Sequence, residues 1–190
     1  MKRLTIAATV ILAVATTTLV FSDTGGPQFR EFLNGFKEVP NPIATTATGI
    51  FNARISKDDP ATIEYELTFQ DLEGDVWQAH IHIGHSQTTG GIVLWLCETS
   101  FNPSPSATTP DCAVNDPGDL RAGKVTGTLT TDDMQPAASN GVAAGEWEEV
   151  LSLIRAGRTY ANVHTTKFPG GEIRVQLDNG DDDSDDHGGH

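Results

Sequence analysis

The sequence predicts an all-β protein, an antiparallel Greek-key β-sandwich with at most one short helix. Several short segments alternate apolar and polar residues, which is the pattern of strands buried on one face. Residues 92–96 form a continuous apolar run, as expected of a strand buried on both faces. Glycine, proline and asparagine separate these segments and favour turns. Many short strands with frequent turns are typical of a sandwich.

The expected strands follow from this alternation, element by element. They cover residues 49–55, 62–69, 76–83, 92–96, 124–130, 158–164 and 172–177. In the second of them, Ile63, Tyr65, Leu67 and Phe69 share the face expected to turn inward. A length of 190 residues predicts a single domain, and roughly seven to nine strands are expected in it.

One helix is expected near residues 147–154. Trp147, Val150, Leu151 and Ile154 recur at the spacing of one helix face, and Gly157 follows as a C-terminal stop. No other segment shows this spacing over a comparable length, so the prediction stops at one short helix.

The N-terminus predicts export. Lys2 and Arg3 precede an apolar run over residues 4–21, the arrangement of a secretory signal, and we expect a signal peptide at 1–22. An uncleaved membrane anchor is the alternative. In an exported chain the two cysteines, Cys97 and Cys112, are expected to form a disulfide rather than two free thiols. The predicted location is secreted or periplasmic.

The charge of the chain narrows the classes of partner. The formal net charge is −14, so nucleic acid and anionic membranes are repelled and neither is expected as a partner after signal cleavage. Residues 178–190 are almost entirely Asp, Gly and His, and such a tail cannot bury apolar surface. We expect residues 178–190 to be an acidic disordered tail.

Three histidines form the candidate site. His80 and His82 leave one face of a strand, while His164 lies on another strand and shares its face with Asn162. We expect the three imidazoles to converge, either as metal ligands or as a structural polar cluster that hydrogen-bonds to Asn162 or Glu172. Glu172 and Arg174 share a strand face, and pairing with each other is their default interpretation.

Three separated motifs carry a family resemblance. Residues 36–40 with 47–49, then 79–84 with 90–93, and finally 156–165 with 169–177 resemble the opening, central and closing motifs of the CHRD domain. The resemblance covers residues 29–177. It implies an extracellular binding or structural module, whose partner is an unidentified extracellular protein or a metal ion.

A second resemblance is to copper–zinc superoxide dismutase, which is also a Greek-key sandwich. The order His-x-His, glycine-rich loop and a late Val-His carries it, and it implies copper as the cofactor of His80, His82 and His164, with Arg174 near the metal. A copper-dependent oxidoreductase is therefore the alternative function. No fourth copper ligand and no zinc loop stand out, so the sequence favours the non-enzymatic function.

Overall fold

The structure of the protein is a computed structural model that describes residues 26–58, 60–112 and 119–178. The expected signal peptide (1–22) and all but the first residue of the expected acidic tail lie outside the described residues. Within them, no helix is long and apolar enough to cross a membrane.

The described part of the chain forms eight strands and one α-helix, so the predicted all-β class is confirmed. The strands are β1 (Gln28–Asn34), β2 (Thr48–Ile55), β3 (Ile63–Gln70), β4 (Val76–Ile83), β5 (Ile92–Cys97), β6 (Gly123–Leu129), β7 (Thr159–Thr165) and β8 (Ile173–Leu177). The helix is α1 (Trp147–Arg155), and three short 3-10 turns span Gly35–Lys37, Thr131–Asp133 and Ala138–Asn140.

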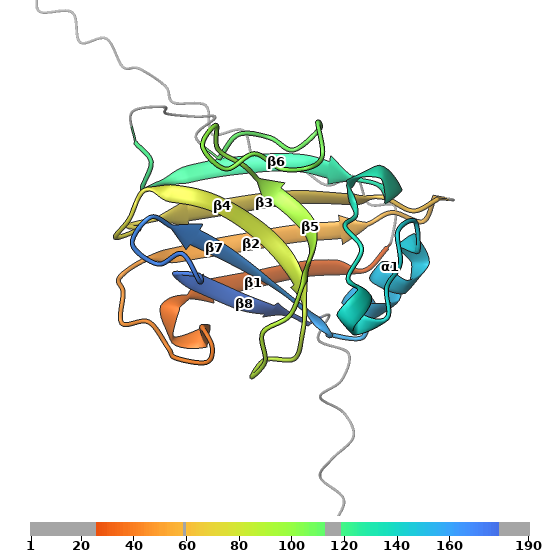
Figure 1. Cartoon of the computed structure of the whole chain (residues 1–190), viewed down its shortest axis with the longest axis horizontal. Helices are drawn as coiled ribbons and strands as arrows, with labels where there is room; N and C mark the ends of the chain where they lie inside the picture. The colour runs from red at the N-terminus through yellow and green to blue at the C-terminus, as the bar shows by residue number, and fades with distance from the viewer. Residues whose placement is uncertain (1–25, 59, 113–118, 179–190) are drawn as a thin grey trace, which may run out of the picture.

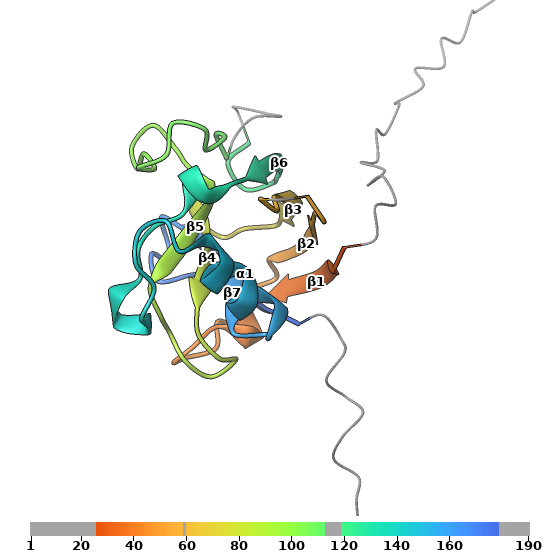
Figure 2. The same cartoon turned by 90° about the vertical axis from the view of Figure 1, so that its right-hand side faces the viewer.

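The strands pair antiparallel in the order β5-β4-β7-β8-β1-β2-β3-β6. β3 pairs with β6 although β4 and β5 intervene in the chain, which is a Greek-key connection. The sheet curls into two facing layers, with β1, β2, β3 and β6 opposite β4, β5 and β7 (Figures 1 and 2). β4 and β7 are direct neighbours, so His80 lies opposite Asn162 and His82 opposite Tyr160 although each pair is far apart in the chain.

Alternation along the strands fills the space between the layers. In β3 the inward residues are all buried, namely Ile63, Tyr65, Leu67 and Phe69. The phenol of Tyr65 donates to the Leu96 carbonyl at 2.6 Å and so joins β3 to β5. β5 is buried along almost its whole length, as its apolar run predicts.

Helix α1 packs against one end of the sandwich (Figure 1). The predicted apolar face is confirmed, because Trp147, Val150, Leu151 and Ile154 are all buried. The Trp147 indole donates to the Ala61 carbonyl at 2.7 Å, which fixes the start of the helix. Gly157 follows with φ +64°, the left-handed conformation that ends a helix.

Strand β1 is not among the strands expected from the sequence. Phe29 and Leu33 point into the core, but Glu31 occupies the inward position between them and breaks the apolar alternation. The strand forms because it pairs over its full length with β2, and its end pairs with β8. Tertiary pairing therefore decides a segment whose local pattern is weak.

The expected disulfide is present and joins Cys97, the last residue of β5, to Cys112. Both half-cystines are fully buried. The backbone between them is also tied to β5, since Cys112 N–H donates to the Glu98 carbonyl at 2.8 Å. The bond therefore closes a long loop over the end of β5.

Candidate metal centre

His80, His82 and His164 converge on one point, as the strand periodicity predicts. One ring nitrogen from each lies within 4.8 Å of the others. Three donors that each sit about 2 Å from a shared ion are about 3.5 Å apart, so the cluster is near the size of a metal site. Among the described residues no other group of three His, Cys, Asp or Glu side chains gathers this closely.

The register of β4 and β7 creates this convergence. His80 lies opposite Asn162 and His82 opposite Tyr160, while His164 lies opposite Gln78 at the next position along the same face. This face points away from the apolar core, because Ala79 and Ile81 occupy the inward positions of β4. The histidines are nevertheless buried, with His80 wholly inaccessible to solvent.

Loop carbonyls fix the tautomers of two of the three rings. His82 Nδ1 donates to the Gly90 carbonyl at 3.0 Å, and His164 Nδ1 donates to the Pro169 carbonyl at 2.8 Å. A carbonyl only accepts, so Nδ1 carries the proton in both rings and Nε2 holds the lone pair. Both lone pairs are therefore available inside the cluster, which is the arrangement of metal-binding histidines.

Several ring nitrogens at the centre have no hydrogen-bond partner in the protein. They are both nitrogens of His80 and Nε2 of His82, and each is shielded from solvent. Leaving a buried polar atom unpaired costs about 1–3 kcal/mol. A structural polar network would pair these atoms, so this geometry fits a metal ligand set better than a purely structural cluster.

Burial keeps the three rings neutral. It lowers the pKa of His82 to about 4, with a hydrogen bond to Gly90 acting in the opposite direction. It lowers the pKa of His164, and it lowers the pKa of His80 further, with a contribution from the two neighbouring histidines. Neutral imidazoles are the form that binds metal ions.

Asn162 lies beside the histidines as expected, and its amide is oriented by Glu38. The amide donates to the Glu38 carboxyl, which turns its oxygen toward His164 Nε2 at 3.0 Å. Both of these facing atoms carry lone pairs, and the contact is repulsive unless a cation or proton lies close to both. This contact is a second indication that the centre suits a cation.

Glu38 is a member of the site that sequence reasoning missed. It is only 4% exposed, and its Oε1 has no hydrogen-bond partner. Burial raises the pKa of its carboxyl to about 7, against the lowering by the nearby Arg174. The residue lies within one of the family-like motifs, but nothing in its local sequence distinguishes it from an ordinary exposed loop glutamate.

Tyr160 and Arg174 form the wall of the site. The rings of His82 and Tyr160 stack with centroids 4.8 Å apart and planes 3° from parallel. The Arg174 guanidinium lies 3.4 Å from the centroid of the Tyr160 ring, a cation–π contact. Arg174 also donates to the carbonyls of His85 and Thr88, which holds the β4–β5 loop over the cluster.

Glu172 forms no hydrogen bond with the histidines, so the expectation that it would bond to them is wrong. Its carboxylate accepts hydrogen bonds from the Thr45 and Thr165 hydroxyls and from the Glu73 backbone, each at 2.8 Å. It therefore anchors loops below the site. The default pairing of Glu172 with Arg174 is also wrong, because the hydrogen bonds of each side chain go to different partners.

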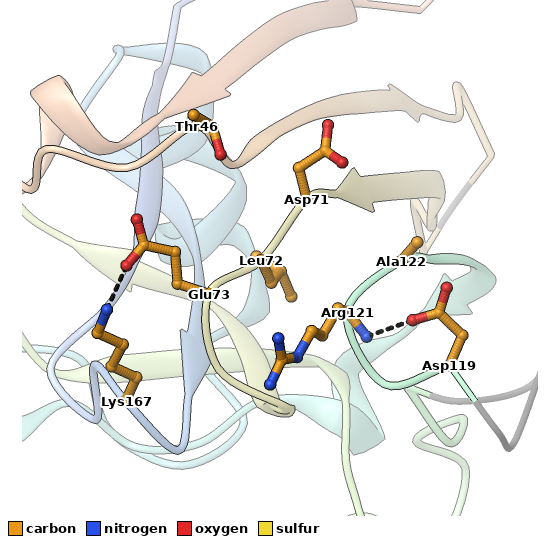
Figure 3. Close-up of a pocket in the computed structure, with 8 residues that line it drawn as sticks. All are labelled: Thr46, Asp71, Leu72, Glu73, Asp119, Arg121, Ala122 and Lys167. Carbon is orange, nitrogen blue, oxygen red and sulfur yellow. Dashed lines mark hydrogen bonds and ion pairs between the residues drawn. The ribbon is translucent and has the colours of Figure 1, made fainter.

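A separate polar pocket of about 500 Å³ contains none of the histidines (Figure 3). Lys167 binds Glu73, and the Arg121 backbone N–H donates to Asp119. The Arg121 guanidinium forms an ion pair with Asp75, outside the lining, at 3.5 Å. The lining combines three carboxylates with two cations, so this pocket has only a small excess of negative charge.

Comparison with known proteins gives one result. The family model of the CHRD domain matches residues 29–177, nearly the whole described part of the chain. No curated protein and no solved structure matches the chain. The matched range contains all three histidines, the disulfide and the loops that cover the site. The chain therefore belongs to the CHRD domain family.

Proposed function

We propose that this CHRD domain is an extracellular metal-binding module that holds a copper ion through His80, His82 and His164. The observation that carries the proposal is that one nitrogen of each buried histidine lies within 4.8 Å of the others, and that those of His80 and His82 have no hydrogen-bond partner. Imidazole is a good ligand for copper and zinc. A bound ion would pair His82 Nε2 and one of the two unpaired nitrogens of His80, and so remove the cost of leaving those two atoms unpaired.

Two further features support this proposal. Gly90 and Pro169 orient the rings of His82 and His164 from two separate loops. Such outer contacts orient metal ligands and strengthen binding. An extracellular location is supported by the disulfide and by the apolar N-terminal run.

The alternative of a copper-dependent oxidoreductase has less support. The ring nitrogens without partners each expose less than 1 Å² to solvent, so a substrate has no open approach to an ion held there. A catalytic metal site usually keeps one such position open. Binding is therefore the proposed function, and a structural or protein-binding role of the module is compatible with it.

The test is metal content of the full chain after dialysis against excess copper. His187 and His190 are replaced by serine in every sample, because those two residues lie outside the described part and offer competing imidazoles. We expect one copper ion per chain in this background and in His85→Gln, which alters an exposed imidazole outside the cluster. We expect little copper in His82→Gln or His164→Gln. Full copper content in either of these two variants, with the circular dichroism of the parent, would overturn the proposal.

A further inference from the structure

We propose that the histidine centre selects the monovalent ion, copper(I), over the divalent ions copper(II) and zinc(II). This inference rests on the proposed function, because it concerns the charge and oxidation state of the ion bound at the same three histidines. It follows from four properties of the centre: its donor count, its lack of anionic ligands, its burial and the charge of its surroundings.

The donor set is neutral and small. Each histidine offers one neutral nitrogen, and no carboxylate or thiolate belongs to the group. Zinc(II) in proteins is almost always four-coordinate, and copper(II) prefers tetragonal sites. With three neutral nitrogens, either divalent ion needs a further ligand, as zinc(II) bound by three histidines takes a water in the fourth position, and the donor set supplies no negative charge.

The hydrogen bonds that orient the ligand rings add no negative charge either; the buried Glu38 carboxyl contacts Asn162 rather than a ring, and its charge is offset by the nearby Arg174. His82 and His164 donate to backbone carbonyls, where many zinc sites use a carboxylate. Glu172, the carboxylate that the sequence places nearby, is committed to Thr45, Thr165 and the Glu73 backbone. The ligands are therefore not made more basic by an ionised partner.

The surroundings are more favourable to one positive charge than to two. The guanidinium of Arg174 stacks on Tyr160, whose ring stacks on His82. The guanidinium is therefore separated from the His82 ring only by the ring of Tyr160. A second positive charge on the ion would increase its repulsion from the guanidinium.

Burial reinforces the preference. His80 is wholly inaccessible, and His82 and His164 are 7% and 6% exposed. The cost of moving an ion from water into a low-dielectric interior rises with the square of its charge, so a divalent ion pays about four times the cost of a monovalent one. Only anionic ligands would offset that difference, and the centre has none.

One further donor lies at hand, the amide oxygen of Asn162. It lies 3.0 Å from His164 Nε2 and is neutral, and its NH₂ group is engaged by Glu38. An oxygen of this kind adds no negative charge to the centre. Asn162→Asp places an anionic oxygen at the same position with almost no change in shape. Because it also removes the NH₂ group that faces Glu38, it is made together with Glu38→Gln, whose amide can donate to the second carboxylate oxygen, and is compared with Glu38→Gln alone.

The experiment measures the affinities of the full chain for copper(I), copper(II) and zinc(II) by competition with chromogenic chelators, with copper(I) kept under anaerobic reducing conditions. The background again carries serine at His187 and His190. We expect copper(I) to bind more tightly than copper(II), and each tenfold preference raises the reduction potential above that of the aqueous ion by about 59 mV. Relative to Glu38→Gln alone, we expect Asn162→Asp with Glu38→Gln to reverse the trend, by raising the zinc(II) affinity and lowering the reduction potential.

The outcomes separate the two proposals. If no ion binds at the histidines, the proposed function itself fails. If zinc(II) or copper(II) binds as tightly as copper(I) or more tightly, and His164→Gln abolishes that binding, the metal site stands and the preference for copper(I) is overturned. An electron paramagnetic resonance signal of copper(II) that persists at full strength under mild reductant would overturn the preference in the same way.

Discussion

The ring of Tyr160 lies flat against that of His82, with centroids 4.8 Å apart and planes 3° from parallel. The same tyrosine accepts a hydrogen bond from Gly90 N–H at 3.3 Å, and the Gly90 carbonyl accepts one from His82 Nδ1 at 3.0 Å. Tyr160 therefore orients His82 twice, by direct stacking and through Gly90.

Tyr160→Phe should keep the stack and remove the hydrogen bond to Gly90. We expect it to lower the free energy of unfolding by about 1 kcal/mol. Metal affinity should fall by about 10-fold, because the loop that orients His82 loses an anchor. Tyr160→Leu removes the stack as well and should weaken metal binding further. Urea denaturation and copper titration of both variants measure these effects, and equal affinities in the two variants would show that the stack has no part in binding.

Gly171 is expected to tolerate no side chain. Its φ of +125° is a conformation that other residues rarely adopt, and a Cβ there would collide with Glu38 Oε1 and lie 2.7 Å from Asn162 Nδ2. Gly171→Ala should lower the free energy of unfolding by about 2 kcal/mol or more. Gly170→Ala is the matched control, since a Cβ at that position meets nothing within 4 Å. Similar losses in both variants would contradict the packing described around Glu38.

Glu38→Gln should change how stability depends on pH. In the folded chain the pKa of Glu38 is raised from 4.5 to about 7, so the folded state holds a proton that the unfolded state releases. The stability of the parent therefore falls as pH rises from 4.5 through about 7, by up to about 3 kcal/mol from this residue. Glutamine resembles the protonated acid but does not ionise, so the stability of the variant should not fall in this way as the pH rises.

Unfolding by urea at pH 5 and at pH 8 measures the difference. The variant should gain stability relative to the parent between the two pH values, while Glu149→Gln on the exposed face of α1 serves as a comparison at an accessible carboxyl. A stability difference between Glu38→Gln and the parent that is the same at both pH values would mean that Glu38 ionises normally in the folded chain.

The disulfide is expected to contribute through the unfolded state. Cys97 and Cys112 are 15 residues apart, and closing a loop of that length is worth about 3 kcal/mol on the chain-entropy account. The double variant Cys97→Ser, Cys112→Ser should lose about that much, and the reduced parent should behave alike. The three histidines lie on β4 and β7, and Cys97 pairs with Ala79, whose side chain faces the core rather than the site. The copper content of the folded double variant should therefore not change.

The alternation along β4 and β7 was sufficient to predict the main geometry of the site. A period of two places His80 with His82 and His164 with Asn162, and neighbouring strands then bring the two pairs together. The apolar face of α1 was equally predictable, because four buried residues recur at helix spacing. Both features follow from the spacing of residues within one strand or helix, which the sequence shows directly.

The remaining features depend on contacts between distant segments. Glu38 is buried beside Gly171 and Asn162, which are far from it in the chain. Glu172 forms hydrogen bonds with Thr45 and Thr165 and not with the histidines. The partners of His82 and His164 at Gly90 and Pro169 are backbone carbonyls, which every residue has, so no residue type in the sequence identifies them. Periodicity identifies the face on which a residue lies, but it does not identify the loop that covers that face.

The most direct test of a copper centre is a crystal structure of the copper-loaded full chain, with anomalous diffraction measured on either side of the copper absorption edge. We predict one strong anomalous peak bounded by His80, His82 and His164, with Nδ1 of His82 and His164 still bonded to Gly90 and Pro169. An anomalous peak located elsewhere, with the three histidines in contact only with one another and with water, would contradict the account.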